Sequence, residues 1–261
     1  MTDFYNAFVL MLIFGVPPSK LNILAVDAHP EGTLDPVWMT LFGKFIRAGR
    51  LQQPVVFQNL IWGLLGYFSP LNEHERTNVP YLDEFREFFL SRHNISTKHT
   101  INCSKLNVLF IWRRDYVAHP RNPHGSVVRK FENEDEMMQE VQENLGTGAN
   151  VQGMQLDAMP MTDQLRAVAK ADVLIGMHGA GLSHILFLPA TSGVIEFKPE
   201  YSNPALQHFK CMAEWRNLPY TIWHNYDPAN ERASHKTYIP RSVMKSTFKS
   251  IHKQICQTKE D

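Results

Sequence analysis

The chain has 261 residues, with 26 lysines and arginines against 26 aspartates and glutamates, so its formal net charge is zero. Hydrophobic residues make up 44% and aromatic residues 11%, which excludes a disordered chain and allows one large domain or two modest ones. The balanced charge argues against a nucleic-acid partner or a polybasic membrane-surface protein. Three cysteines permit at most one disulfide, and the absence of a C-x-x-C pair argues against a zinc site.

The first hundred residues mix helical and strand-like patterns. The apolar run from Phe8 to Val16 is far shorter than the ~20 residues of a membrane helix and lacks a signal-peptide pattern, so we expect a buried helix. The pattern predicts strands over residues 21–26 and 55–58 and helices over residues 34–45 and 81–90. Residues 27–32 form the loop that follows the first strand.

The second part of the chain alternates strands and helices regularly. We expect strands over residues 107–112, 150–154, 173–177, 193–197 and 220–223. We expect helices over residues 133–142, 162–170, 205–215 and 241–256, with Asn133 and Glu136 forming a capping box and Thr162 capping the next helix. Such alternation predicts an α/β fold with a parallel sheet covered on both faces.

The polar stretch 91–104 is the best candidate for a domain boundary. It divides the chain into halves at residues 1–98 and 99–261, which would leave a cleft with ligands at the carboxyl ends of the strands. The same stretch holds two N-glycosylation sequons, which begin at Asn94 and at Asn102. Two sequons this close hint at a secretory compartment, although sequons also arise by chance.

The strongest local signal is the apolar strand 173–177, which runs directly into His178, Gly179, Ala180 and Gly181, with Ser183 just beyond. Glycines allow a ligand to approach the backbone, and exposed amides at a helix start bind anions. The turn therefore predicts a phosphate cradle, the alternative being a tight strand–helix turn without a ligand. His178 is either a donor to a phosphate oxygen or a buried structural histidine.

Charged residues follow or end several other predicted strands. Arg113 and Arg114 follow the strand that ends at residue 112, and Arg121 and Arg129 lie on the loop beyond it. Arginine grips phosphate in a bidentate manner, although any one of these residues could equally be a solvated surface charge.

Two carboxylates and a histidine also lie at or just after the ends of predicted strands. Glu196 ends a strand and is a candidate for holding ribose hydroxyls, or an ordinary polar strand end. Asp27 and His29 follow the first strand, where either could act as a general base. The acidic run 132–136 lies at a helix start, where acids favour the helix dipole, so we expect no metal ligands there.

The sequence lacks the motifs of two other classes of protein with glycine-rich turns, the α/β-hydrolases and the dinucleotide-binding proteins. A His-Gly-x-Gly turn also forms the oxyanion hole of α/β-hydrolases, but the G-x-S-x-G pentapeptide of those enzymes is absent. The dinucleotide fingerprint G-x-G-x-x-G is absent as well, because Gly179-Ala180-Gly181 continues as Leu182-Ser183-His184.

The segment from Ile175 to His184 resembles the signature of glycosyltransferase family 61. The likeness extends in order through residues 2–8, 26–29, 108–121, 164–167 and 215–220, and so spans nearly the whole chain. The run from Asp115 to Arg121 favours the branch of the family that transfers xylose.

The resemblance implies a GT-B fold, made of two Rossmann-like halves, and an inverting reaction with a nucleotide-sugar donor. The xylosyl branch uses UDP-xylose and acts on the core β-mannose of N-glycans in the Golgi lumen, giving a β1,2 linkage. The diphosphate would then lie against Gly179 to Ser183, with Arg113 and Arg129 neutralising its charge. Glu196 would hold the ribose, Asp27 or His29 would be the base, and no metal or other cofactor would be required.

One departure from the family concerns the amino terminus. Family members carry a membrane anchor and stem before the segment that resembles residues 2–8, whereas Met1 stands at that segment here. The expectation is therefore an amino-terminal half that is incomplete, with membrane attachment only through an anchor outside this chain. Two other functions stay open: an O-linked GlcNAc transferase of the same family that uses UDP-GlcNAc, and a truncated, inactive nucleotide-binding or scaffold protein.

Overall fold

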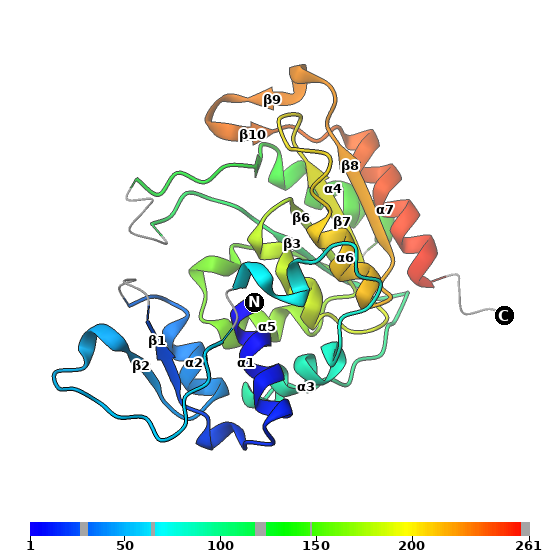
Figure 1. Ribbon diagram of the computed structural model, residues 1–261. Coiled ribbons are helices and arrows are strands. Elements are labelled where there is room, and N and C mark those ends of the chain that lie inside the picture. The colour runs from blue at the N-terminus through cyan, green and yellow to red at the C-terminus, as the bar shows by residue number, and fades with distance from the viewer. Residues whose placement is uncertain (27–30, 64–65, 118–123, 147, 257–261) are drawn as a thin grey trace. The chain divides into compact units, whose positions relative to one another are not determined.

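The computed structural model describes residues 1–26, 31–63, 66–117, 124–146 and 148–256 (Figure 1). The chain divides into two compact units, residues 1–94 and 95–261, and the division falls within the polar stretch 91–104. Each unit is described by itself. No helix within the described residues is long and apolar enough to cross a membrane.

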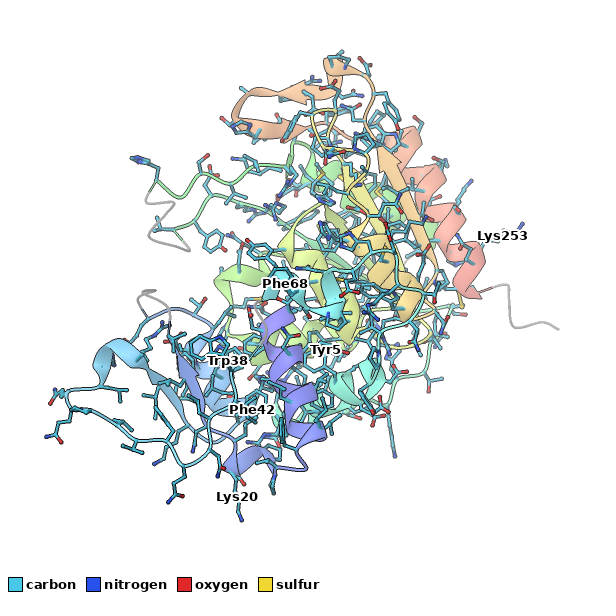
Figure 2. All side chains as sticks on the ribbon, in the orientation of Figure 1. Tyr5, Lys20, Trp38, Phe42, Phe68 and Lys253 are labelled. Carbon is cyan, nitrogen blue, oxygen red and sulfur yellow. A yellow bond between two sulfur atoms is a disulfide. The ribbon has the colours of Figure 1, made fainter. Side chains whose placement is uncertain are left out.

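The first unit is built on an aromatic core. Its regular elements are α1 (Thr2–Ile13), β1 (Ile23–Ala25), α2 (Asp35–Leu41), β2 (Phe45–Arg47) and α3 (Leu82–Arg92). Phe4 and Tyr5 of α1 meet Phe85 and Phe89 of α3 edge to face, with ring centroids 5.5–5.7 Å apart. In Figure 2, Tyr5, Trp38 and Phe42 lie within this unit, whereas Lys20 extends outward.

Three elements of the first unit differ from the sequence-based expectation. The α1 helix begins and ends earlier than the predicted helix over residues 8–16 and stops at Ile13, just before Gly15 with its left-handed φ of 60°. The α2 helix stops at Leu41, because Phe42 is extended and residues 45–47 pair in parallel with β1. The predicted strand over residues 55–58 is wrong, because those residues are exposed and have no strand partner among the described residues.

The second unit contains a parallel five-stranded sheet, which confirms the predicted α/β class. The strand order is β5-β3-β6-β7-β8, and every neighbouring pair is parallel. The strands are β3 (Asn107–Ile111), β5 (Asn150–Met154), β6 (Val173–Met177), β7 (Gly193–Lys198) and β8 (Tyr220–His224). All residues of β6 and β7 are buried, as expected for central parallel strands covered on both faces.

Helices cover both faces of this sheet. One face carries α4 (Glu134–Leu145) and α7 (Arg241–Cys256), whose apolar residues share one core with Phe110, Ile175 and Phe197. The residues that alternate with these three point to the other face, where the 3-10 helix η6 (Ala180–Phe187) packs. A Cβ on Gly176 would lie 3.0 Å from Leu182 of η6, so glycine permits this close packing. The remaining helices are α5 (Met161–Val168) and α6 (His208–Trp215).

Two predicted helix caps are wrong. The helix α5 begins after Pro160, not at Thr162. Asn133 stands at the start of α4 but caps no helix amide, because its side chain instead bonds both the N–H and the C=O of Ile239, at 3.0 and 2.9 Å. It thereby joins α4 to the segment that follows a small sheet, in the order β4 (Lys130–Phe131), β10 (Lys236–Thr237), β9 (Glu231–Arg232).

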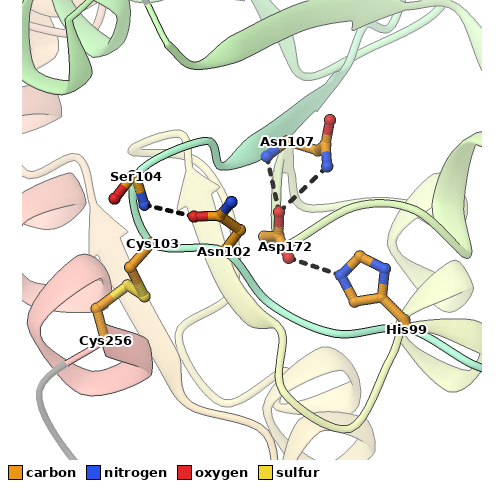
Figure 3. The surroundings of a disulfide bond; sticks show 7 residues. All are labelled: His99, Asn102, Cys103, Ser104, Asn107, Asp172 and Cys256. Carbon is orange, nitrogen blue, oxygen red and sulfur yellow. Dashed lines mark hydrogen bonds and ion pairs between the residues drawn. A yellow bond between two sulfur atoms is a disulfide. The ribbon is translucent and has the colours of Figure 1, made fainter.

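A disulfide joins segments near the two ends of the second unit (Figure 3). It is the one bridge that three cysteines allow. Cys103 precedes β3, and Cys256 ends α7, 153 residues later, with 5.8 Å between their Cα atoms. The remaining cysteine, Cys211, is buried and takes no part in the bridge. Near the bridge, the buried carboxylate of Asp172 accepts hydrogen bonds from the backbone N–H of Asn107 at 2.8 Å and from His99 at 2.7 Å.

Candidate active site

The predicted binding residues of the second unit gather where parallel strands end. Arg113 follows β3, and His178 and Gly179 follow β6, the neighbouring strand. Because parallel strands end at a common edge, these residues lie beside one another, at the position where α/β folds bind ligands.

Gly179 and Arg113 are in direct contact. Gly179 has an extended backbone, with a φ of 164°, so its conformation does not require glycine. The lack of space at this position does favour glycine, because a Cβ would lie 2.1 Å from Nη1 of Arg113 and 2.7 Å from its Cζ. The missing side chain therefore lets the guanidinium lie against the backbone of the glycine turn.

The glycine turn leads directly into η6. Ala180, the first residue of η6, is exposed, and Ser183 is half-buried in the next turn. A Cβ on Gly181 would lie 3.0 Å from Cγ2 of Ile111, so this glycine keeps η6 close to β3. The first N–H groups of a helix have no partners within it, so the start of η6, directly after Gly179, offers donors for an anion.

Arg113 is held in place and is half-buried. Its Nε donates a hydrogen bond to the carbonyl oxygen of Val128 at 3.1 Å. Burial, followed by the positive charge of Arg129, lowers the pKa of Arg113. The guanidinium still remains charged at neutral pH, because arginine does not lose its proton in proteins.

Arg129 brings a second positive charge to this site under local strain. Its φ is 61°, in the left-handed region that residues with a side chain seldom adopt. Its backbone N–H donates to the hydroxyl of Tyr201 at 3.2 Å. Its Nε is buried and has no hydrogen-bond partner among the described residues. Two guanidinium groups that repel each other, one with an unused donor, form a site suited to an anion.

Asp115 ties together the described parts of the loop that carries both arginines. Its Oδ1 accepts from the backbone N–H of Val127 at 2.8 Å and from Nζ of Lys130 at 2.9 Å, and these bonds lower the pKa of its carboxyl group. Tyr116 adds a backbone bond to Gly125 at 2.9 Å. This role of Asp115 could not be predicted from the sequence, because only the folded loop brings residues 115 and 127 together.

The residues on either side of Arg113 make other contacts. Arg114, which the sequence also named, forms an ion pair with Glu134 at the start of α4. Trp112 lies in the core, 5.0 Å from the ring of Phe110 and 5.5 Å from that of Phe131. Arg121 lies outside the described residues.

His178 is buried and has a carboxylate partner. Its Nδ1 is hydrogen-bonded to Oε1 of Glu196, and its ring meets that of Phe209 edge to face at 5.0 Å. Its ring is therefore fixed by protein contacts.

Glu196 is enclosed within the sheet. The side chain is 1% exposed, with one carboxylate oxygen bonded to His178 and the other to the hydroxyl of Tyr220. A contact between Glu196 and a ribose would require one of these bonds to open, so the ribose role stays a prediction without geometric support. The sequence did not point to Tyr220, because that partner depends on the pairing of β7 with β8. Burial, then the Glu196 charge, raises the pKa of Tyr220.

The second histidine of the motif is a core residue. Burial lowers the pKa of His184 to about 4, so its imidazole is neutral at physiological pH. The ring nitrogen Nδ1 donates to the carbonyl oxygen of Gly181 at 2.9 Å, which braces the turn from inside.

The catalytic and metal predictions remain open. Asp27 and His29 lie outside the described residues, so their role as base is neither supported nor opposed. Within the described parts of the chain, no group of three or more histidine, cysteine, aspartate or glutamate side chains could hold a metal ion.

A groove of about 770 Å³ adjoins the anion site and shares Arg113 with it. Its charged residues are balanced in sign, and three pairs neutralise one another: Arg114 with Glu134, Lys130 with Asp115, and Lys236 with Glu132. The groove is lined by Arg113, Arg114, Asp115, Lys130, Phe131, Glu132, Asn133, Glu134, Asp135, Glu136, Arg232, Lys236 and Tyr238. A polar groove without net charge suits an uncharged ligand that is rich in hydroxyl groups.

Comparison with known proteins agrees with the motif. The family model described as Glycosyltransferase 61 matches residues 2–195. A beta-1,2-xylosyltransferase of Arabidopsis thaliana is 31% identical over 94% of this chain and 52% of its own length. A beta-1,2-xylosyltransferase of Oryza sativa is 32% identical over 84% of this chain and 45% of its own length. An EGF domain-specific O-linked N-acetylglucosamine transferase of Drosophila melanogaster is 27% identical over 86% of this chain and 42% of its own length.

This chain spans about half the length of the curated relatives it matches. The family match nevertheless covers most of the chain and includes the glycine turn with the arginine beside it. The chain belongs to glycosyltransferase family 61.

Proposed function

We propose that this protein transfers xylose, with inversion, from UDP-xylose to the core β-mannose of N-glycans. The observation that carries the proposal is the guanidinium of Arg113 lying against Gly179, beside the strained Arg129 with its unused buried donor. In this proposal, the donor diphosphate lies between the two arginines and the first amides of η6. The sugar specificity rests on the two relatives named as beta-1,2-xylosyltransferases.

The two arginines would act on the leaving group. Transfer of the sugar leaves both electrons of the broken bond on the β-phosphate oxygen of UDP. Preorganised donors at such an oxygen are each worth about 3 kcal/mol of barrier. Arginines and helix amides would supply this stabilisation without a metal ion or other cofactor. The groove beside Arg113, which is polar and has no net charge, would receive the sugar moiety.

The base in this proposal is Asp27, or else His29, which would take the proton from the attacking mannose hydroxyl. The GT-B arrangement, with residues 1–98 as the acceptor-side half, is part of the proposal and rests on the family alone. An Asp27→Asn variant that keeps UDP-xylose binding and loses turnover would support the assignment. Near-normal turnover of that variant would remove Asp27 from the mechanism.

Calorimetry on the purified chain tests the donor half directly. We expect UDP-xylose to bind without metal, and more tightly than UDP-GlcNAc or GDP-mannose. Arg113→Ala should abolish most of this binding, whereas Arg166→Ala, which removes an exposed arginine of α5 paired with Asp163, should leave it unchanged. Equal loss in both variants would show that general surface charge, not the anion site, binds the donor.

A second function is favoured by the relative from Drosophila melanogaster, which is named as an O-linked N-acetylglucosamine transferase. Preference for UDP-GlcNAc in the same experiment would keep the site and change the donor. Binding of none of the three donors would instead favour an inactive scaffold protein.

We propose the Golgi lumen as the site of action, with nucleotide sugar and glycoprotein as partners. The disulfide between Cys103 and Cys256 supports a secretory compartment, because such bonds persist where thiols are oxidised. Two exposed sequons, at Asn94 and Asn102, point the same way.

A further inference from the structure

We propose that the sequon at Asn102 and the disulfide of Cys103 compete during biosynthesis, so that Asn102 is glycosylated only before the disulfide closes. The proposal rests on the proposed secretory location of this protein. Its basis is an overlap visible in Figure 3: Cys103 is the middle residue of the sequon Asn102-Cys103-Ser104.

The folded sequon is a closed turn. Oδ1 of Asn102 accepts from the backbone N–H of Ser104 at 3.0 Å, and the carbonyl oxygen of Asn102 accepts from the N–H of Lys105 at 2.8 Å. A glycan-transferring enzyme must take the asparagine and the serine into its own active site, which requires the segment to separate from the protein surface. Exposure of Asn102 is therefore not sufficient for modification.

Covalent and buried anchors prevent that separation after folding. Cys103 is bonded to the end of α7, and α7 packs on the sheet through Ile251 and Ile255. On the other side, Leu106 is 1% exposed and the N–H of Asn107 is bonded to Asp172. Only two residues, Ser104 and Lys105, lie between the bridge and this buried anchor.

The order of synthesis leaves time for glycosylation. Cys256 follows Cys103 by 153 residues, which corresponds to roughly 8–30 s at synthesis rates of about 5–20 residues per second. During this interval, Cys103 has no native partner and the sequon is part of a flexible chain. The later closure of the bridge ends the interval.

Both competing reactions are balanced by ordinary reactants of a secretory compartment. In glycosylation, Nδ2 of Asn102 bonds to the first sugar carbon of a lipid-linked oligosaccharide, the lipid pyrophosphate leaves, and the amide proton passes to the enzyme. In bridge formation, the thiols of Cys103 and Cys256 lose two electrons and two protons to a disulfide of an oxidoreductase, which becomes a dithiol.

The nearby sequon Asn94-Ile95-Ser96 is an internal control. Asn94 is exposed, as Asn102 is, but no cysteine lies within its sequon. Conditions that change the general efficiency of glycosylation should affect both sites, whereas bridge closure should affect Asn102 alone.

The test is glycopeptide mass spectrometry on the chain secreted from eukaryotic cells behind a cleavable signal sequence. In the wild type, we expect lower occupancy at Asn102 than at Asn94. Cys256→Ser should remove this difference by raising Asn102 alone, and Cys211→Ser, which removes the cysteine outside the bridge, should change neither site. A short treatment of the cells with dithiothreitol should act on the wild type as Cys256→Ser does.

Three results would overturn the proposal: wild-type occupancy at Asn102 equal to that at Asn94, unchanged Asn102 occupancy in Cys256→Ser, or a parallel rise at both sites. Cys256→Ala provides a second variant if Cys256→Ser is retained in the cell. UDP-xylose binding, measured on the same secreted protein, reports on the donor site separately, so failure of that proposed function is distinguishable from failure of the competition.

Discussion

Replacement of Gly179 by alanine should disable the donor site without unfolding the protein. The added Cβ would lie 2.1 Å from Nη1 of Arg113, so one of the two groups must move. The guanidinium is the far end of a flexible side chain, whereas the turn is fixed between β6 and η6. We therefore expect Arg113 to move, with little change in the free energy of unfolding.

The expected loss follows from what Arg113 gives up. A hydrogen bond to a charged group contributes about 1.5–3 kcal/mol, which corresponds to a roughly 10- to 150-fold weaker affinity for UDP or UDP-xylose. Isothermal titration calorimetry measures this change, and thermal unfolding of the same samples checks the fold. Gly181→Ala is a useful comparison, because its Cβ would meet Ile111 of the core at 3.0 Å and should lower stability.

A double-mutant cycle decides whether Gly179→Ala acts through Arg113. If it does, the variant with both Gly179→Ala and Arg113→Ala should bind UDP no more weakly than Arg113→Ala alone. Additive losses in the double variant would refute the reasoning, because they would show that Gly179 contributes to binding independently of the arginine.

Three further predictions concern strain, burial and the disulfide. Arg129→Gly should relieve the left-handed backbone strain at this residue, raise the free energy of unfolding by about 1 kcal/mol and weaken UDP binding. A lower free energy of unfolding in denaturant would contradict the claim that the backbone is strained here. The pKa of His184 is lowered from 6.5 to about 4, so its contribution to stability is full above pH 6.5 and is lost as the pH falls through about 4. Unfolding free energies measured at pH 7 and pH 4 should therefore differ by about 2–3 kcal/mol less in His184→Gln than in the wild type, and an equal difference would show that His184 is not responsible. Removal of the disulfide by Cys103→Ser should lower the free energy of unfolding by about 2–5 kcal/mol, because the bridge closes a long loop, and unchanged stability of the reduced wild type would argue against this.

The central sheet could be predicted from the sequence because its strands are continuous apolar runs. The runs over residues 173–177 and 193–197 contain enough adjacent apolar residues that only burial on both faces suits them. The final helix shows the same clarity, with apolar residues at helical spacing between Arg241 and Cys256. In each case, the local pattern and the tertiary environment agree.

The small sheet could not be predicted in the same way. The strands β4, β9 and β10 contain two residues each, which is too short for a local periodicity to reveal them. In addition, β4 and β10 pair residues 106 positions apart. The wrong strand over residues 55–58 is the reverse case, since its apolar residues have strand propensity but no strand partner among the described residues. Pairing decides both outcomes, and pairing depends on the whole fold.

In the candidate site, too, local features could be predicted from the sequence, whereas contacts that depend on strand pairing could not. Gly179 and Arg113 were identifiable because strand ends and glycine turns are local features. The surroundings of Glu196 were not, because both partners of its carboxylate, His178 and Tyr220, come from neighbouring strands. A polar residue near a strand end can face solvent or the interior, and the sequence alone does not distinguish these environments.

Three energetically unfavourable features meet at Arg129, in the proposed anion site. Arg129 combines a left-handed backbone with a buried donor that has no partner among the described residues, and its charge repels that of Arg113. None of these features strengthens the fold, and each would be relieved or satisfied by a bound diphosphate, which offers negative charge and acceptor oxygens. The bonds of Asp115 to Val127 and Lys130 help to hold the loop that carries both arginines. A strained backbone and an unsatisfied buried donor at the same residue are expected where binding, and not stability, determines the residue type.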